Sequence, residues 1–162
     1  MRTAASSTRP AAGLRLIHHG PLALRLRWRL EALRILFETH SFWARGRSRA
    51  QLRRMLSGSQ AVVSAWQNGE LIGFGRATSD GAFRAVLWDV VVAEEHQGRG
   101  LGRRIVEELL HCPAVRQVER VYLMKTNSAG FYRRLGFDTS HSQHLLVWRR
   151  RRQEEHELQE SP

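Results

Sequence analysis

One stretch decides the fold: residues 87–103 have the sequence LWDVVVAEEHQGRGLGR. It opens with an apolar run rich in β-branched residues, which is typical of a buried strand. A polar segment follows, and the stretch ends in a glycine-rich turn. Residues 101–111 then carry apolar side chains at helical spacing, so the turn joins a strand to a helix. Such a turn presents unpaired backbone N–H groups and the positive end of a helix dipole, which suits a phosphate group.

The glycines of this turn do not fit two familiar phosphate-binding loops. A P-loop needs Gly-Lys followed by Ser or Thr, and the turn contains no lysine. A dinucleotide-binding fingerprint, Gly-x-Gly-x-x-Gly, would need its third glycine at Arg103 or at Ile105. Three glycines flanked by two arginines exceed what a plain turn needs, so we expect a ligand-binding loop of another kind.

Length and composition bound the class of protein. At 162 residues, with 42% hydrophobic and 25% charged residues, the chain has the size and composition of one globular domain. These values exclude a wholly disordered chain, and no apolar run is long enough to span a membrane. The single Cys112 excludes an intramolecular disulfide and a thiolate-cluster zinc site. The histidines lack zinc-ligand spacing, so we expect no metal.

The net charge is the unusual number. It is +11 at neutral pH, and Lys125 is the one lysine among 26 basic residues. Such an excess favours a polyanionic partner, either nucleic acid, anionic lipid or a phosphate-rich cofactor. It fits a solvated arginine-rich surface equally well, so the total charge does not choose among these interpretations.

Both ends of the chain differ from the middle in composition. Residues 1–13 are rich in Ala, Ser, Thr and Arg and contain no acidic residue, so we expect a flexible N-terminal arm. This composition is also that of a transit peptide. Residues 149–162 begin with four arginines and continue into an acidic run, which predicts a charged C-terminal tail. The folded domain is therefore expected over residues 14–148.

Hydrophobic periodicity predicts a mixed α/β chain. Apolar residues at three- and four-residue spacing predict helices over 30–40, 49–56, 101–111 and 129–135. Apolar runs predict strands over 14–18, 61–66, 71–77, 83–92, 118–124 and 145–148. Asn68-Gly69 and Asp80-Gly81 suit tight turns, so the second, third and fourth strands are expected to be antiparallel. The order predicts a largely antiparallel central sheet flanked by helices.

Two sequence blocks resemble the GNAT superfamily of acyl-CoA-dependent N-acetyltransferases. The first is the turn, which matches the Gln/Arg-x-x-Gly-x-Gly/Ala signature with Gln97, Gly98, Arg99, Gly100, Leu101 and Gly102. The second is the block NSAGFYRRLGF at 127–137, which looks like the family's element of an asparagine followed by Phe-Tyr and Gly-Phe. The resemblance covers 14–148 and implies the GNAT fold, in which a V-shaped split separates the two middle strands.

The resemblance implies acetyl-CoA as co-substrate. It places the pyrophosphate on the backbone of residues 97–102, with Arg99 and Arg103 as charge partners. It also implies that Val90 and Val92 pair with the pantetheine like an added strand. The implied cofactor-binding residues are Val90, Val91, Val92, Gln97, Gly98, Arg99, Gly100, Leu101, Gly102, Arg103, Asn127 and Tyr132.

The resemblance also implies how the acyl group is held. A bulge on the strand before the loop parts it from residues 121–124 and opens a cleft for the thioester. A backbone N–H near Val91 would polarise the thioester carbonyl, and one such donor is worth about 3 kcal/mol elsewhere.

Tyr132 is the predicted general acid. A phenol with a pKa near 10 stays protonated at neutral pH and can give its proton to a departing thiolate. The alternative is that Tyr132 only packs beside Phe131. Its position five residues after Asn127 and before Gly136-Phe137 favours the catalytic role.

Asp89 is the second predicted catalytic residue. An alkylammonium needs about 4 kcal/mol of help to become neutral near pH 7. Asp89 lies within an apolar strand, where a carboxylate is costly unless it is paired or used. It could anchor the ammonium, accept its proton through water, or bond a neighbouring strand. Strict alternation would place Trp88, Val90 and Val92 on one face and Leu87, Asp89 and Val91 on the other.

Within the superfamily, the strand residues 87–92 followed by the turn residues 97–102 are similar to the plastid and cyanobacterial branch. Members of that branch acetylate arylalkylamines such as serotonin, and some acetylate protein N-termini or lysines. We therefore expect an N-acetyltransferase for a small arylalkylamine such as serotonin or tryptamine, with a protein N-terminal or lysine acetyltransferase as the alternative. The alternative from another class is a catalytically idle module that binds acyl-CoA or nucleic acid.

The expected partners are coenzyme A and an amine. We expect neither a membrane nor a nucleic acid partner, because coenzyme A itself accounts for part of the basic excess. The chain is expected to be a monomer or a homodimer. The expected location is the cytoplasm, or a plastid if the N-terminal arm is the remnant of a transit peptide.

Overall fold

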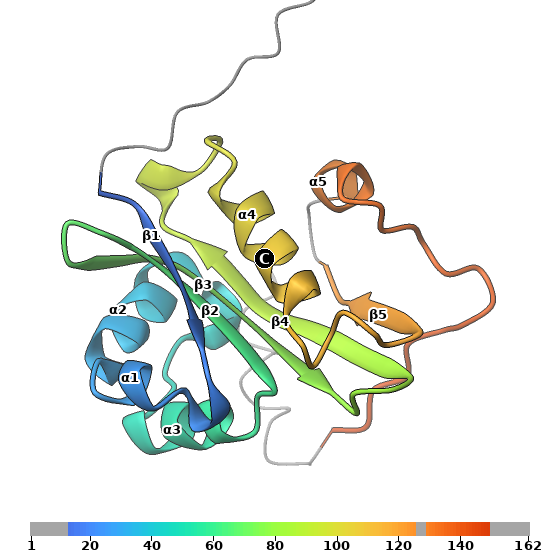
Figure 1. Cartoon of the computed structure of the whole chain (residues 1–162), viewed down its shortest axis with the longest axis horizontal. Coiled ribbons are helices and arrows are strands. Elements are labelled where there is room, and N and C mark those ends of the chain that lie inside the picture. The colour runs from blue at the N-terminus through green and yellow to red at the C-terminus, as the bar shows by residue number, and fades with distance from the viewer. Residues whose placement is uncertain (1–12, 126–128, 150–162) are drawn as a thin grey trace, which may run out of the picture.

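The computed structural model describes residues 13–125 and 129–149, and one sheet lies at its centre (Figure 1). The elements before the hairpins are β1 (Arg15–His19), a 3₁₀ turn (Pro21–Ala23), α1 (Leu24–Arg27), α2 (Leu30–His40), a second 3₁₀ turn (Phe42–Ala44) and α3 (Arg49–Ser57). The later elements are β2 (Ala61–Gln67), β3 (Glu70–Ser79), β4 (Arg84–Val92), a third 3₁₀ turn (Glu94–His96), α4 (Leu101–His111), β5 (Arg120–Leu123) and α5 (Ala129–Arg134).

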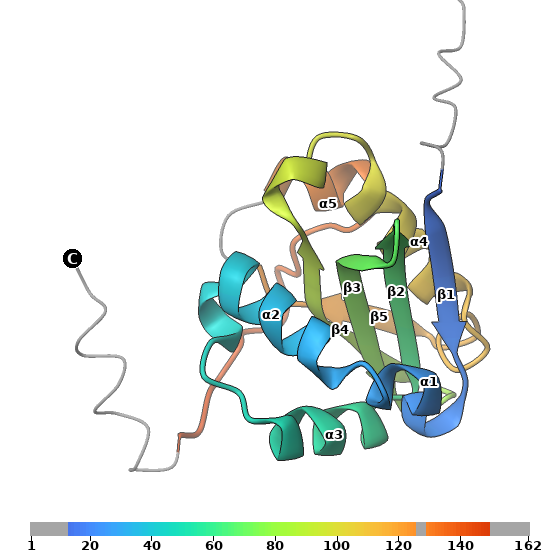
Figure 2. The same cartoon turned by 90° about the vertical axis from the view of Figure 1, so that its left-hand side faces the viewer.

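The sheet has the order β1-β2-β3-β4-β5. Neighbours are antiparallel from β1 to β4, and β4 pairs with β5 in parallel. The first hairpin turns at Asn68 and Gly69, which both have positive φ angles as a type I′ turn requires. Helices cover both faces of the sheet (Figure 2). The predicted fold, a largely antiparallel sheet flanked by helices, is confirmed.

The two faces of the sheet are packed differently. On the face covered by α2, the rings of Phe37 and Phe74 meet edge to face with centroids 5.4 Å apart. On the face covered by α4, β3 carries Gly73 and Gly75, and a Cβ at either position would come within 2.7 Å of Ile105. These glycines therefore allow α4 to approach the sheet closely. The position of α4 also fixes where the glycine-rich turn before it lies.

A β-bulge interrupts β4 next to this turn. Arg76 pairs with Trp88 and Phe74 pairs with Val91, so β4 has one residue more than β3 between the two pairs. Asp89 takes up the irregularity with a φ of 51°, which is rare for a residue other than glycine.

The bulge changes which side chains share a face. The Trp88 indole donates a hydrogen bond to Thr78, and its ring and the carboxylate of Asp89 both contact the Arg76 guanidinium. The predicted grouping of Trp88 with Val90 and Val92 is therefore wrong, because the extra residue shifts the two-residue alternation.

Beyond the bulge, β4 and β5 separate. Their parallel pairing ends at Leu87 and Leu123, and no described residue pairs with that edge of β4 over residues 88–92. The bulge bends the strand and ends the pairing there. The V-shaped split between the two middle strands is thus present and leaves one backbone edge of β4 open.

The predicted strand over residues 145–148 is wrong. Residues 143–149 have no regular secondary structure, and Leu146 is 91% exposed. An apolar run becomes a strand only where a neighbouring strand supplies hydrogen-bond partners, and the sheet of the described residues consists of β1 to β5 without this segment. The predicted arm (1–13) and tail (149–162) lie almost wholly outside the described residues and stay predictions. No helix in the described part of the chain is long and apolar enough to cross a membrane.

Candidate active site

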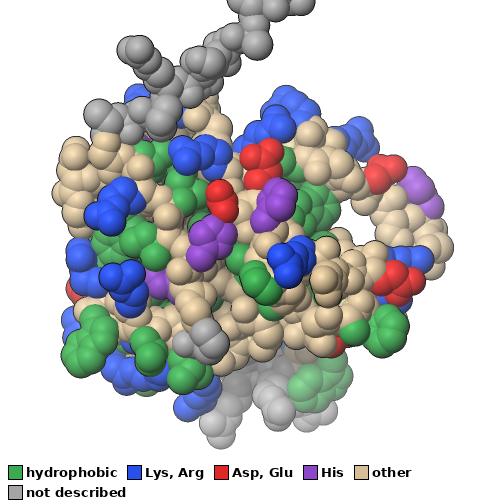
Figure 3. All heavy atoms as spheres, in the orientation of Figure 1, with side chains coloured by type: hydrophobic (Ala, Val, Ile, Leu, Met, Phe, Trp, Pro, Cys, Tyr) green, Lys and Arg blue, Asp and Glu red, His purple; other side chains and the backbone are tan. Residues whose placement is uncertain are grey.

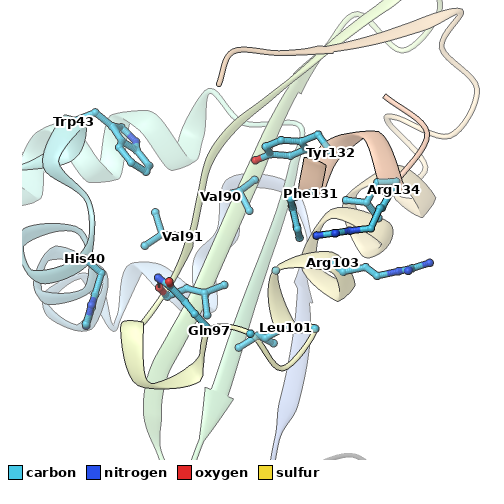
Figure 4. Close-up of a pocket in the computed structure, with 15 residues that line it drawn as sticks. His40, Trp43, Val90, Val91, Gln97, Leu101, Arg103, Phe131, Tyr132 and Arg134 are labelled. Atoms are coloured by element: carbon cyan, nitrogen blue, oxygen red, sulfur yellow. Dashed lines mark hydrogen bonds between the residues drawn. The ribbon is translucent and has the colours of Figure 1, made fainter. Parts of the chain in front are cut away.

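Two cavities open on either side of the bulge. The glycine-loop cavity has a volume of about 550 Å³ and lies between the end of β4, the turn before α4, and α5. Its lining residues are His40, Trp43, Val90, Val91, Val92, Gln97, Gly98, Gly100, Leu101, Gly102, Arg103, Phe131, Tyr132, Arg134 and Leu135 (Figure 4). Most residues that the sequence predicted to bind the cofactor are thereby brought together in one hollow.

The backbone of the turn faces this cavity as a phosphate site requires. Gly98 and Gly100 have φ angles of 71° and 79°, which favour glycine. The first recorded bond of α4 runs from the N–H of Arg104 to the carbonyl of Gly100, so the three preceding N–H groups have no intrahelical partner. A Cβ built on Gly100 has no neighbour within 4 Å, so the cavity is open beside this residue.

Side chains support the turn and add charge to it. The Gln97 amide donates a 2.9 Å hydrogen bond to the carbonyl of Val92, which ties the turn to the end of β4. Arg103 lines the cavity, and its guanidinium donates a hydrogen bond to Glu107 at 2.7 Å. Arg99 does not line the cavity, whereas Arg134, which the sequence analysis did not select, does. Arg134 lies two residues after Tyr132, so it belongs to the second sequence block and could have been selected from it as a charge partner.

The bulge cavity has a volume of about 680 Å³ and lies on the other side of the split. Its lining residues are Phe42, Trp43, Arg47, Arg76, Leu87, Trp88, Asp89, Val90, Leu123, Met124, Lys125 and Tyr132. The two cavities share Trp43, Val90 and Tyr132. A molecule in one cavity can therefore meet a molecule in the other at these three residues.

Tyr132 is held at this junction by aromatic packing. Its ring meets those of Phe131 and Phe137 edge to face, with centroids 4.9 and 5.9 Å away. In Figure 4 its hydroxyl points toward the gap between Val90 and Trp43. Burial raises the pKa of the Tyr132 phenol above its usual value near 10. The phenol is therefore protonated at neutral pH, as a proton donor must be.

Asp89 is the one carboxylate among the described residues that line the bulge cavity, and it accepts several hydrogen bonds. Its Oδ2 accepts a hydrogen bond from Arg76 Nε at 2.8 Å, and its Oδ1 accepts from Arg47 Nη1 and the Trp43 indole, both at 3.2 Å. The Asp89 side chain is only 5% exposed. Because Arg76 lies on β3, Asp89 bonds to the neighbouring strand, which was one of its expected roles.

The carboxylate still has room for one more donor. Two carboxylate oxygens offer about four acceptor positions, and three donors occupy them here. Anchoring an ammonium or accepting a proton through water therefore stays a prediction for Asp89. Asn127, the remaining predicted site residue, lies outside the described residues.

The thiol of Cys112 lies away from both cavities. Cys112 contacts His18 Nδ1 at 3.5 Å, and burial, with the neighbouring Glu108 charge, raises the pKa of its thiol. A raised pKa reduces the thiolate fraction and so the reactivity. Within residues 13–125 and 129–149, no group of three or more His, Cys, Asp or Glu side chains could hold a metal ion. Lys and Arg side chains are dispersed over the face shown in Figure 3.

The order of elements, the split sheet and the glycine turn can be compared with known proteins. The model of the acetyltransferase (GNAT) family matches residues 26–137. The chain belongs to the GNAT family. This confirms the family that the two sequence blocks predicted, and the match spans both the glycine turn and the Phe-Tyr block.

Relatives by sequence include proteins that are named as chloroplastic. GCN5-related N-acetyltransferase 2, chloroplastic, of Arabidopsis thaliana is 44% identical over 73 residues, which are 44% of this chain and 28% of that protein. Serotonin N-acetyltransferase 2, chloroplastic, of Oryza sativa subsp. japonica is 40% identical over 96 residues, 56% of this chain and 48% of that protein. The chain matches half or less of the length of these curated relatives.

Solved structures share the fold over most of the chain. A GNAT family acetyltransferase of Streptococcus pneumoniae TIGR4 superposes with a TM-score of 0.68 at 20% identity, covering 85% of this chain and 98% of that one. At that identity the likeness shows the fold alone. This GNAT protein thus has the mixed α/β architecture predicted from its element order.

Proposed function

We propose that this GNAT protein transfers an acetyl group from acetyl-CoA to a primary amine, and that the amine is a small arylalkylamine such as serotonin or tryptamine. The observation that carries the proposal is the junction of the two cavities at Trp43, Val90 and Tyr132. A cofactor cavity and an acceptor cavity must meet at the reacting atoms, because transfer requires the amine within contact distance of the thioester.

Acetyl-CoA fits the glycine-loop cavity on three counts. The free N–H groups at the start of α4 suit its pyrophosphate, and Arg103 and Arg134 add positive charge. The open edge of β4 over residues 88–92 can pair with the pantetheine amides in the manner of an added strand. Bound there, acetyl-CoA supplies an activated acyl group with a thiolate leaving group.

The chain's own residues then lower the barrier. A backbone N–H near Val91, beside the bulge, donates to the thioester oxygen as negative charge develops on it. The amine nitrogen forms a C–N bond to the carbonyl carbon, and the C–S bond breaks as the tetrahedral centre collapses. Tyr132 gives its phenolic proton to the departing sulfur and regains a proton from solvent, while the amine's proton leaves through Asp89 or water.

The aromatic lining supports an aromatic acceptor. Phe42, Trp43 and Trp88 line the bulge cavity, and flat rings pack well against such walls. The rice relative that matches 56% of this chain is named a serotonin N-acetyltransferase, which agrees with this class. A soybean relative, named histone acetyltransferase TAP1, is 44% identical over 69 residues and supports the protein-substrate alternative.

A thiol-release assay with acetyl-CoA tests the proposal. The panel contains serotonin, tryptamine, spermidine, a lysine peptide and a peptide with a free N-terminus, each with a blank lacking amine. Turnover on the arylalkylamines supports the proposal, and turnover restricted to the peptides supports the protein-substrate alternative. Acetyl-CoA binding without turnover on any amine would identify an idle binding module.

The cytoplasmic location stays a prediction. The relatives named as chloroplastic in Arabidopsis thaliana and rice support the plastid alternative instead. Imaging of the chain fused to a fluorescent protein in a plant cell, with and without residues 1–13, distinguishes the two locations. Loss of plastid signal on removal of residues 1–13 would identify the arm as a targeting segment.

A further inference from the structure

The charges that line the bulge cavity are unequal in number. Arg47, Arg76 and Lys125 line it together with one carboxylate, Asp89. The single carboxylate neutralises one of three cations, so the lining keeps an excess of positive charge. An acceptor that is only a cation meets repulsion from this excess, whereas an acceptor with an anionic group meets attraction.

The two arginines also keep unused hydrogen-bond donors. Arg76 donates from Nε to Asp89 and from Nη1 to Ser59. Arg47 donates from Nη1 to Asp89 and to Met55 Sδ. No described residue accepts a hydrogen bond from the Nη2 group of either arginine. A guanidinium has five N–H donors, so both side chains can still bind a carboxylate.

Asp89 fixes where those donors lie. It contacts Arg47 at 3.2 Å and Arg76 at 2.8 Å, and the exposed fractions of the arginine side chains are 30% and 15%. The guanidiniums are therefore held in place before a ligand arrives, and partly shielded from water. Charge-assisted bonds made by such preorganised, partly buried groups are stronger than those on an open surface.

We propose that the acceptor of the bulge cavity is an amine that carries a carboxylate beside it, of which an aromatic α-amino acid is the simplest form. The carboxylate binds Arg47 and Arg76, and the amine occupies the remaining acceptor position of Asp89. The aromatic side chain packs against Phe42 or Trp88. This inference rests on the proposed acetyl transfer and narrows the acceptor from an arylalkylamine to one that also carries a carboxylate: the same C–N bond forms, the same C–S bond breaks, and an N-acetylated amino acid leaves.

Matched pairs of amines test the proposal. Tryptophan and tryptamine differ only in the carboxylate, and tryptophan methyl ester keeps the shape while removing the charge. We expect kcat/KM for tryptophan to exceed that for tryptamine and for the ester by about tenfold or more, since a hydrogen-bonded charge pair is worth at least that much. The dipeptide Ala-Glu tests whether the carboxylate belongs instead to an acidic peptide. A higher kcat/KM for Ala-Glu than for tryptophan would overturn the amino acid in favour of such a peptide.

The Arg47→Gln variant tests the contact. We expect it to lower kcat/KM for tryptophan about tenfold more than it lowers that for tryptamine. Lys125 is exposed, so Lys125→Gln should not disturb folding. It should also lower kcat/KM for tryptophan, by a smaller factor than Arg47→Gln. Arg49→Gln is the matched control, because Arg49 pairs with Glu31 and does not line the cavity. An equal loss in the control, or equal losses for both amines, would overturn the proposal.

A binding measurement separates this inference from the proposed function. Calorimetry in the presence of coenzyme A should show tryptophan binding to the wild-type protein and weaker binding to Arg47→Gln. Tryptophan binding without acetyl transfer to any amine would uphold the ligand and refute the activity. Turnover on tryptamine with tryptophan bound no better would uphold the activity and refute the carboxylate.

Discussion

The glycine-loop cavity and the bulge cavity share three residues but are built by different means. The glycine-loop cavity is lined by the turn before α4, whose first N–H groups have no intrahelical partner, and by the end of β4, where no described residue pairs with one edge of the strand. The bulge cavity is made by side chains from elements far apart in the sequence, among them Arg47, Arg76 and Lys125.

This difference separates the part of the site that binds a common cofactor from the part that selects the acceptor. A backbone cradle depends on chain conformation, so one short motif can hold the same cofactor whatever side chains surround it. A side-chain cavity depends on charge and shape at each position, so its ligand can change while the fold stays. Changes in the first cavity should therefore act on acetyl-CoA, and changes in the second on the acceptor.

The largest effect is expected from Gly100→Val. A β-branched side chain at a φ of 79° is strained, and its Cβ would enter the open space before the free N–H groups. We expect acetyl-CoA binding to become undetectable by calorimetry. Gly81→Val is the matched control, because Gly81 has a φ of 77°, no neighbour within 4 Å of its Cβ, and lies in the turn between β3 and β4. Equal loss of binding in the control would argue against the glycine turn as the acetyl-CoA site.

A second large effect is expected from Tyr132→Phe, which removes one hydroxyl at the junction of the cavities. Loss of a general acid typically costs 10²- to 10⁴-fold, so kcat at pH 7 should fall by about 10²-fold or more, with acetyl-CoA affinity unchanged. Tyr122→Phe changes the chain's other tyrosine, which lines neither cavity, and should keep full activity. A fully active Tyr132→Phe enzyme would leave Tyr132 with a packing role only.

The pH profile sharpens the same test. The wild-type rate should rise with pH as the amine loses its proton. Burial raises the Tyr132 pKa, so the phenol stays protonated through pH 9 and the rate should not fall below about pH 10. The thiolate of coenzyme A leaves more easily without help as pH rises, so the deficit of Tyr132→Phe should shrink toward pH 9. A deficit that is constant across pH would argue against proton donation.

An intermediate effect is expected from Asp89→Asn. Removing the charge leaves Arg47 and Arg76 without their carboxylate, which should lower the free energy of unfolding by about 3 kcal/mol. kcat/KM for the amine should fall about tenfold, and acetyl-CoA affinity should not change. In the control, Asp80→Asn weakens the acceptor of three turn N–H groups away from both cavities and should lower stability without changing amine kinetics. Equal kinetic losses in the two variants would make Asp89 purely structural.

The smallest effects are expected from the cations of the glycine-loop cavity. Arg134→Gln should weaken acetyl-CoA binding by about fivefold at low salt, and the loss should shrink at high ionic strength. Arg103→Gln should have a smaller effect, because Arg103 already donates to Glu107. A loss as large as that in Gly100→Val would show that side-chain charge, rather than backbone, dominates this cavity.

Local sequence patterns predicted most of the helices and strands and most of the residues that line the glycine-loop cavity. The helices over 30–40 and 101–111 match α2 and α4, because their apolar spacing is set by local geometry. The glycine turn could be predicted because the strand, the turn and the helix that build it are contiguous over residues 87–111. Tyr132 was found in the same way, from a block of neighbouring residues, whereas Arg134 in that block was not selected.

The residues that line the bulge cavity, and which strands join the sheet, depend on the tertiary structure. The contact of Arg47 and Arg76 with Asp89 depends on how the segment before α3 packs against β3 and β4, and no local spacing encodes it. The bulge at Asp89 reverses the expected face of Trp88, because register is a property of two paired strands and not of one. The apolar run at 145–148 forms no strand for the same reason: strand formation requires a partner, and which segments pair is settled by the folded chain as a whole.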